Sequence, residues 1–261
     1  MLLGAAGREQ SHYACSGTIL FIDFNVVASQ IPGTIHGTKA ASLPQKLVLA
    51  GIHLLVIAAV AWLLFDGGIH TVAGWLGTDW TAGSSARRTL LFACSSVYFL
   101  RLLPGTFVFL KRRMAWGEVA IVAPWIAAIH ITFAFLGGTQ QATIGTSDVL
   151  SLLLYGTGSY LNTGSEYLRY LWKLQPENQG HLYTLGLFRY AMHINYFGDL
   201  VLFSGYALLT RNVWAGSIPL LMLGGFVFFN IPALDAYLER KYAAEFKSYA
   251  RRTRKLIPVL Y

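Results

Sequence analysis

Residues 186–199, with the sequence GLFRYAMHINYFGD, place four polar side chains among apolar neighbours. If the segment is helical, Arg189 and His193 share one face, and Asn195 and Asp199 share another, because each pair lies four residues apart. Polar groups at the head of a membrane helix are costly unless they meet a partner, water or a ligand. The segment is therefore the leading candidate for a polar binding site. Alternatively, each side chain is satisfied singly, by the membrane interface, by packing or by a neighbouring helix.

A second polar pattern precedes this segment. Glu166, Arg169 and Lys173 are spaced three and four residues apart, which places them on one helical face. The simpler interpretation is a solvated ladder of ion pairs at the end of a membrane helix. The functional interpretation is that Arg169 and Lys173 hold phosphate groups, while Asn162 and Glu166 bind ribose or amide groups.

Tyr98 and Arg101 lie within an apolar stretch, three residues apart. An arginine in the middle of a membrane helix is costly and normally faces a cavity or an acid. Arg101 either pairs with a carboxylate for structural reasons or faces a bound cofactor. In the second case Tyr98 is a proton donor, because a phenol of ordinary pKa near 10 keeps its proton at neutral pH.

The C-terminal tail carries a fourth pattern, in residues 235–242. Asp235, Glu239 and Tyr242 share a helical face, with Arg240 beside them. The tail is interpreted either as an amphipathic helix on anionic lipid or as a segment that closes over a nucleotide.

The elements that must position these residues are membrane helices. The chain is 55% hydrophobic and 12% charged, whereas soluble domains carry about 25% charged residues. The sequence therefore predicts an all-α integral membrane protein. Its net charge of +8 would suggest nucleic acid in a soluble protein. Here the basic residues lie at helix ends and in the tail, where membrane topology, anionic headgroups or a phosphorylated cofactor account for them.

We predict six to seven transmembrane helices with a cofactor cavity that faces the cytoplasm. Residues 1–46 form an N-terminal segment, and residues 47–261 form one membrane domain whose cofactor-binding half is 148–261. The expected spans are 47–65, 89–110, 119–136, 149–161, 187–209 and 213–234, with a polar loop at 162–185. Residues 17–28 form a further span, a re-entrant piece or an interfacial helix.

Charge places the basic tail in the cytoplasm, together with the 162–185 loop and the basic run 111–113. The uncharged turn at 137–148 then lies outside, as the positive-inside rule requires. Arg87 and Arg88 also lie outside, against that rule. The cytoplasmic side thus collects the polar patterns described above.

Several kinds of site are excluded. Cys15 and Cys94 are far apart and give no disulfide framework, and His130 and His193 are too isolated to argue for a metal. The chain also lacks the glycine-rich dinucleotide-binding, P-loop, HExxH and GxSxG motifs.

The 186–199 segment resembles the hallmark of the steroid 5α-reductase family and its bacterial DUF1295-like membrane relatives, roughly G-L-[WF]-R-Y-x-x-H-x-N-Y-F-G-[ED]. The wider similarity covers about 100 residues from Asn162 to the C-terminal Tyr249…Arg252…Leu256-Ile257-Pro258. The resemblance implies a seven-helix membrane reductase. Such enzymes use NADPH to reduce a carbon–carbon double bond conjugated to a ketone in a lipophilic, steroid-like substrate.

The resemblance also implies roles for single residues. Tyr98-Phe99-x-Arg101 resembles the segment that carries the catalytic tyrosine, so Tyr98 is the expected proton donor. The family's Gln-Glu pair, which grips the steroid ketone, has no counterpart; Asp66 is nearest in spacing. Positions that match cofactor contacts are Asn162, Glu166, Lys173, Tyr183, Asn195 and Asp199. The full set of expected cofactor-binding residues adds Arg101, Arg169, Arg189, His193, Asp235 and Arg240.

Two other functions remain open. The C-terminal half also resembles isoprenylcysteine and phospholipid methyltransferases, which use S-adenosylmethionine, although Met192-His193-Ile194-Asn195 departs from their Arg-His-Pro motif. A non-catalytic membrane protein on the same scaffold is the third possibility. We expect a bacterial inner membrane or the endoplasmic reticulum, a cytoplasmic C-terminus, and no nucleic-acid or obligate protein partner.

Overall fold

The structure, a computed structural model, describes residues 42–260. It is helical, and the described part of the chain contains no strand, only an isolated parallel bridge between Ala191 and Arg254. The expected all-α class is confirmed. The possible helix at 17–28 lies outside the described residues.

The elements follow one another along the chain with short connections. Segments labelled η are π-helical or 3₁₀ turns. In order they are α2 (Leu43–Phe65), α3 (Gly68–Leu76), α4 (Ser85–Pro104), η1 (Gly105–Phe109), α5 (Trp116–Gly138), α6 (Thr146–Ser159), η2 (Tyr160–Gly164), α7 (Ser165–Leu174), η3 (Pro176–Asn178), η4 (Gly186–Arg189), α8 (Ile194–Leu209), η5 (Val213–Gly216), α9 (Ser217–Gly225), η6 (Phe226–Asn230), α10 (Ile231–Tyr242) and α11 (Ala244–Arg252).

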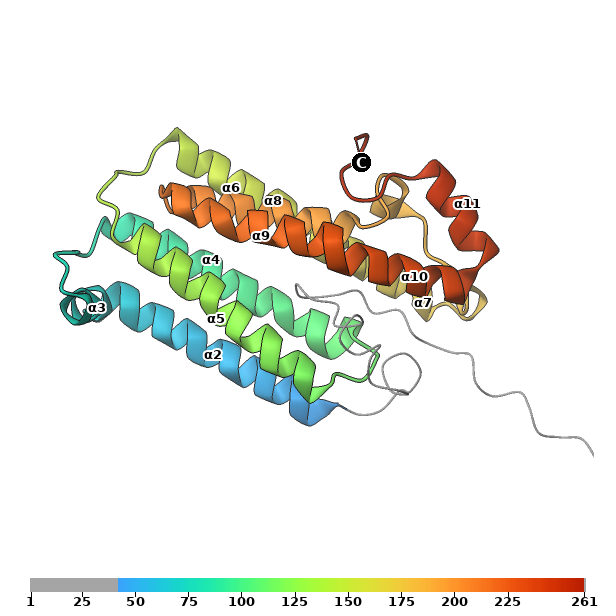
Figure 1. The fold of residues 1–261 in the computed structure, drawn as a ribbon, viewed down its shortest axis with the longest axis horizontal. Helices are drawn as coiled ribbons and strands as arrows, with labels where there is room; N and C mark the ends of the chain where they lie inside the picture. Colours follow the sequence, from blue (N-terminus) through green and yellow to red (C-terminus); the bar gives the residue numbers. More distant parts are fainter. Residues whose placement is uncertain (1–41, 261) are drawn as a thin grey trace, which may run out of the picture.

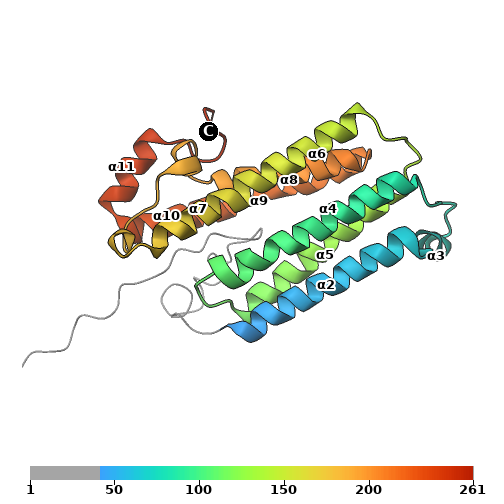
Figure 2. The ribbon, with the colours of Figure 1, turned by 180° about the vertical axis from the view of Figure 1, so that it is seen from behind.

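The helices form two layers (Figure 1). One layer contains α2, α4 and α5, and the other contains α6, α8 and α9, as the reverse view confirms (Figure 2). Helices α7, α10 and α11 continue beyond the second layer at one end of the molecule, which we name the α11 end. Helix α3 and the turns after α5 and α8 lie at the opposite end, the α3 end.

Four described helices are long and apolar enough to cross a membrane, which makes the chain an integral membrane protein. They are Leu43–Phe65, Ser85–Phe109, Trp116–Gly138 and the long helix Val213–Arg252. Helix α8 is apolar but shorter, at 16 residues, or roughly 24 Å. The described part of the chain thus contains four candidate spanning helices, and the expected number of six to seven is not confirmed.

The polar loop predicted at 162–185 is wrong in its first half. The chain continues from α6 through η2 and α7 as one helical run, and the loop begins only at Gln175. Glu166, Arg169 and Lys173 therefore lie on a helix, as their spacing indicates, and that helix continues from α6. Likewise, the last predicted span at 213–234 continues through α10 to Tyr242.

The predicted helix over residues 187–209 begins seven residues late, at Ile194. Gly186, with φ of 57°, opens a 3₁₀ turn instead. The backbone N–H groups of Met192 and His193 donate to the carbonyls of Arg254 and Lys255, at 2.7 and 2.9 Å. Because these donors are taken by the tail, they cannot donate within a helix that runs on from residue 187. Arg189 therefore does not share a helical face with His193.

Glycines allow α6 and α8 to pack backbone against backbone. A Cβ atom at Gly198 would lie 2.5 Å from the backbone nitrogen of Asn162, and one at Gly205 would lie 2.6 Å from the carbonyl oxygen of Ser151. Gly158 on α6 meets the backbone of α8 in the same way. Small residues permit this close approach between membrane helices. The contact fixes the register of the two helices.

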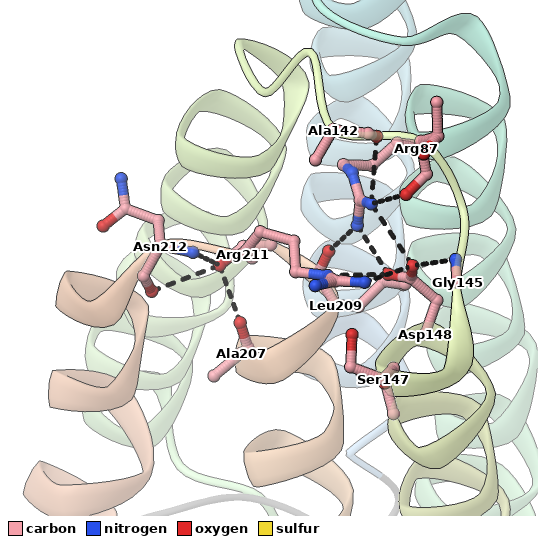
Figure 3. Close-up of polar contacts among 12 residues, drawn as sticks. Arg87, Ala142, Gly145, Ser147, Asp148, Ala207, Leu209, Arg211 and Asn212 are labelled. Atoms are coloured by element: carbon pink, nitrogen blue, oxygen red, sulfur yellow. Dashed lines mark hydrogen bonds and ion pairs between the residues drawn. The ribbon is translucent and has the colours of Figure 1, made fainter.

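The two arginines that oppose the positive-inside rule are not loop charges. Arg87 is fully buried and donates to Asp148 at 2.6 Å and to the Leu209 carbonyl at 2.6 Å (Figure 3). Arg88 donates to the carbonyls of Gly83 and Leu64. The rule concerns charges in loops that face water, so these internally paired side chains do not test it.

The close contact between α6 and α8 predicts different effects on stability for alanine substitutions at two glycines. Gly205→Ala should lower the thermal unfolding midpoint of the purified protein by several degrees, because the new methyl group meets backbone that cannot move independently. Gly224→Ala on α9 is the matched control, since nothing lies within 4 Å of its added Cβ, and it should leave the midpoint unchanged or raise it. Equal midpoints for both variants, measured in the same detergent, would contradict the backbone contact.

Candidate functional site

Three π-helical segments lie at the α11 end, one each in the helical runs that contain α4, α6 and α9. They are η1, η2 and η6. Such segments interrupt regular α-helical hydrogen bonding and occur frequently at functional sites. Asn162 lies in η2, where the helix passes Arg101 of α4 and the first turns of α8. This is the level of the molecule at which the predicted polar residues meet.

Arg101 is the centre of the polar cluster. Its Nη1 donates to Asn162 Oδ1 at 2.8 Å and to Thr163 Oγ1 at 3.0 Å. Its Nη2 lies 3.6 Å from Asp199 Oδ1, and its guanidinium carbon lies 4.8 Å from the centre of the Tyr98 ring. The mid-helix arginine therefore meets an acid, two polar oxygens and an aromatic face, which together offset its desolvation.

A chain of amides and carboxylates continues from Asn162. Its Nδ2 donates to the Asn195 carbonyl at 3.1 Å, and Asn195 Nδ2 donates to Glu166 Oε1 at 3.1 Å. Arg169 pairs with the other oxygen of Glu166. The predicted residues of α7 and α8 are thus joined through side chains, at the point where the glycine contact holds the two helices together.

Three buried atoms of this cluster have no hydrogen-bond partner among residues 42–260. They are the Tyr98 hydroxyl, Asp199 Oδ1 and Arg101 Nε. Tyr98 is only 2% exposed. Buried polar atoms are nearly always hydrogen-bonded, so a donor and an acceptor left unpaired side by side call for an explanation. A ligand that both accepts and donates hydrogen bonds supplies one.

A chain of hydrogen-bonded side chains lies beside Tyr98, and the chemistry of its last acceptor fixes which atom donates at each link. Tyr206 donates to the Leu91 carbonyl at 2.9 Å, because a carbonyl only accepts. The Ser95 hydroxyl then donates to Tyr206 at 2.5 Å, and His130 Nδ1 donates to Ser95 at 3.0 Å. His130 Nε2 accepts from His53 Nε2 at 3.2 Å. This network assigns His53 Nδ1 as an acceptor, and that atom has no partner in the described part of the chain.

The rings of this chain surround Tyr98. The ring centres of His53 and His130 lie 5.9 and 5.4 Å from that of Tyr98, and Phe203 lies at 5.2 Å. The phenol is therefore held on three sides by rings that are themselves fixed. Asp66, nearest in spacing to the family's missing acid, ends α2 thirteen residues after His53, roughly 20 Å further along the helix. It is not placed to act beside Tyr98.

A second group joins the tail to the start of α8. His193 Nε2 lies 3.0 Å from Asp235 Oδ1, and Lys255 Nζ lies 3.1 Å from the other oxygen of Asp235. Tyr249 donates to the Phe188 carbonyl at 2.6 Å. Together with the two backbone bonds that the carbonyls of residues 254 and 255 accept, these contacts make the C-terminal segment part of the site's framework.

Lys173 and Tyr183 lie beside this framework. Lys173 donates to the His181 carbonyl, and its Nζ lies 3.5 Å from the Tyr242 hydroxyl. Tyr183 is buried against Trp172, with ring centres 5.3 Å apart. Burial raises the pKa of Tyr183, with Arg169 opposing the shift, so the phenol stays protonated at neutral pH.

The structure brings most of the predicted site residues to the α11 end, but not all into one cluster. Arg189 is exposed and donates to the hydroxyl of its neighbour Tyr190 at 2.7 Å, and Arg240 is exposed on α10. The cluster around Arg101 contains Tyr98, Asn162, Glu166, Arg169, Asn195 and Asp199, and the tail group contains His193 and Asp235. The sequence reasoning missed Thr163, His53 and Lys255, of which only His53, a histidine inside an apolar segment, gave a signal.

The described residues contain no group of three or more histidine, cysteine or acidic side chains that could hold a metal ion. The arrangement instead offers amides, carboxylates and guanidinium groups, which bind hydroxyl, amide and phosphate groups.

Residues 96–253 match the family described as "Protein of unknown function (DUF1295)". This range covers more than half of the 261 residues. The chain belongs to the DUF1295 family. The matched range begins two residues before Tyr98 and includes every predicted site residue. A search of curated proteins gave no match.

The role of the tail can be tested with two leucines. Leu256 is fully buried and Leu260 is 77% exposed. Leu256→Ala should lower the thermal unfolding midpoint clearly, because deleting a buried leucine side chain costs about 2–5 kcal/mol. Leu260→Ala should leave the midpoint within experimental error. If limited proteolysis and thermal unfolding do not distinguish the two variants, the tail is not part of the folded framework.

Proposed function

We propose that this DUF1295 protein is a membrane-embedded reductase that uses NADPH. Its substrate would be a lipophilic, steroid-like compound with a carbon–carbon double bond conjugated to a ketone. The observation that carries the proposal is the Tyr98 hydroxyl, a buried proton donor that is used by no described residue. The resemblance of this region to the steroid 5α-reductase family supports the same assignment.

Tyr98 is suited to polarise or protonate a ketone oxygen. A tyrosine phenol donates a hydrogen bond at neutral pH, and a positioned acid of this kind contributes typically 10²–10⁴-fold in rate. The Arg101 guanidinium over its ring would stabilise negative charge that develops on the oxygen during reduction. The surrounding rings of His53, His130 and Phe203 fix the phenol and exclude water.

The residues beside Tyr98 fit a nicotinamide dinucleotide. Asp199 Oδ1, buried and without a hydrogen-bond partner among the described residues, is an acceptor for an amide or ribose hydroxyl, and Asn162 and Asn195 offer further amide groups. The basic side chains of Arg169 and Lys173 would hold phosphates. When bound, NADPH supplies the hydride that the protein's own side chains cannot provide. The protein would orient the two reactants and deliver the proton from Tyr98.

The α11 end is proposed to face the cytoplasm, where the dinucleotide is available. Basic residues near this end that face outward include Lys111, Arg113, Lys247, Arg251 and Arg252. At the α3 end, by contrast, Arg87, Arg88 and Arg211 all donate to protein atoms. Among the described residues, exposed basic side chains are thus more numerous at the α11 end, a distribution typical of a cytoplasmic face.

Replacing Tyr98 should separate activity from stability. Tyr98→Phe should reduce NADPH oxidation with an enone, assayed from cyclohexenone to cholestenone, by about 100-fold or more. Its thermal midpoint should stay equal or rise, because the hydroxyl removed has no partner. Tyr155→Phe is the contrasting variant: Tyr155 donates to the Cys94 carbonyl at 2.7 Å, so that variant should lose stability and keep most of its turnover. Full activity in Tyr98→Phe would remove Tyr98 from the mechanism.

Cofactor titration distinguishes the alternatives. NADPH should raise the thermal midpoint of the protein more than NADH does, because the additional phosphate meets basic side chains. Lys173→Gln should weaken the NADPH effect, whereas Lys247→Gln, on the exposed side of α11, should not. Stabilisation by S-adenosylmethionine alone would instead favour a methyltransferase. NADPH binding without turnover of any enone would favour a non-catalytic protein.

A further inference from the structure

A groove of about 640 Å³ opens on the second layer, on a different face of α8 from the polar cluster. It is formed by α8, the turn after it and the start of α9. Along α8 its lining extends from Leu200 to Leu208, or roughly 12 Å, and it continues through the turn to Asn212. The lining residues are Leu200, Ser204, Ala207, Leu208, Arg211, Asn212, Val213, Gly216, Pro219, Leu220 and Leu223.

Most of the groove is apolar, and its rim is exposed. Val213 is 87% exposed and Leu220 is 69% exposed. On a membrane-spanning layer such side chains contact lipid. Because lipid tails are as apolar as leucine, burial of apolar area gives no preference for any one lipid here. Selectivity must come from polar groups at the groove's end.

A fixed cation lies at that end. Arg211 donates to Asp148 through Nη2 at 2.8 Å and Nε at 3.3 Å, and Arg87 donates to the same carboxylate (Figure 3). Two guanidinium groups on one carboxylate leave a net charge of +1. The side chains of Arg87 and Asp148 are at most 1% exposed, whereas that of Arg211 is 31% exposed. The surplus positive charge is therefore presented outward by Arg211.

The backbone of the turn holds this cation in place. Arg211 has φ of 55°, a conformation that L-residues other than glycine rarely adopt. The turn is closed by a bond from Asn212 N to Thr210 Oγ1 at 3.2 Å and by one from Trp214 N to Asn212 Oδ1 at 3.0 Å. Strained residues persist where the surroundings over-determine them, and they concentrate at ligand clamps.

We propose that this groove binds an anionic phospholipid, with one acyl chain along α8 and α9 and the headgroup phosphate on Arg211. The volume lies within the range of ligand sites. An apolar channel that ends in a fixed cation matches a molecule with a hydrocarbon chain and an anionic head. A basic residue near a membrane surface favours anionic lipid by a few-fold, so we expect the protein to retain phosphatidylglycerol about fivefold more than phosphatidylcholine.

The test compares lipids retained by the full-length protein after exchange into detergent with equal amounts of the two phospholipids, measured by native mass spectrometry. Arg211→Gln should remove the preference for phosphatidylglycerol, and Arg211→Lys should keep most of it. Arg113→Gln, which removes an exposed charge at the α11 end, is the matched control and should not change the preference. Because Arg87 still neutralises Asp148 in both Arg211 variants, the protein is expected to stay folded, which its thermal midpoint reports.

Neighbouring leucines test the groove itself. Leu220 lines the groove and Leu221 does not, although both are more than 60% exposed. Leu220→Trp should fill the groove and reduce bound phosphatidylglycerol, whereas Leu221→Trp should leave it unchanged. Equal retention of both lipids by the unmodified protein would overturn the proposal. So would loss of dimers rather than of lipid in Leu220→Trp, since a second copy of the chain would then be the occupant.

Discussion

The close contact between α6 and α8 is the constraint on which the polar cluster depends. At Gly198 a Cβ atom would meet the backbone nitrogen of Asn162, so only glycine lets the π-helical turn of one helix touch the first turns of the other. Asn162 then reaches the Asn195 carbonyl, and Asn195 reaches Glu166. Asn162, Glu166 and Asn195 are buried, and buried polar groups need hydrogen-bond partners. The close backbone contact brings those partners within reach of one another.

The sequence predicted the residues of this cluster better than their arrangement. Asn195 and Asp199 lie one turn apart on α8, and Glu166 and Arg169 one turn apart on α7, as their spacing indicated, because local periodicity survives folding. Arg189 was misplaced for a non-local reason: the N–H groups of residues 192 and 193 bond the C-terminal tail. No local pattern carries information about a partner some sixty residues away. Arg87 likewise looked like a misplaced loop charge until its partner, 61 residues later, was known.

Around Tyr98, the hydrogen bonds that stabilise the fold are made by neighbouring side chains and not by the Tyr98 hydroxyl itself. The chain from His53 Nε2 to Tyr206 is hydrogen-bonded at every link, and its direction is set by the Leu91 carbonyl at its end. That chain fixes the rings around Tyr98 but does not use the Tyr98 hydroxyl. A fully connected polar network stabilises and orders a core, whereas an atom left outside it contributes only its desolvation cost. Packing holds the Tyr98 hydroxyl in place, and because no described residue hydrogen-bonds to it, it is available to a ligand.

Two buried aspartates also differ in whether the chain itself supplies their hydrogen-bond partners. Asp148 and Asp199 are 0% and 2% exposed. Asp148 accepts bonds from Arg87, Arg211 and the Gly145 N–H, the last at 2.8 Å, as expected of a buried carboxylate whose role is structural. Asp199 Oδ1 has its nearest cation at 3.6 Å and accepts no hydrogen bond among the described residues. Both carboxylates are shielded from solvent, but they differ in how many donors the chain supplies to them. The fold gives Asp148 every donor it can accept, and it leaves Asp199 an acceptor with room for a donor from outside the chain, next to the one buried phenol of the cluster that has a proton to give.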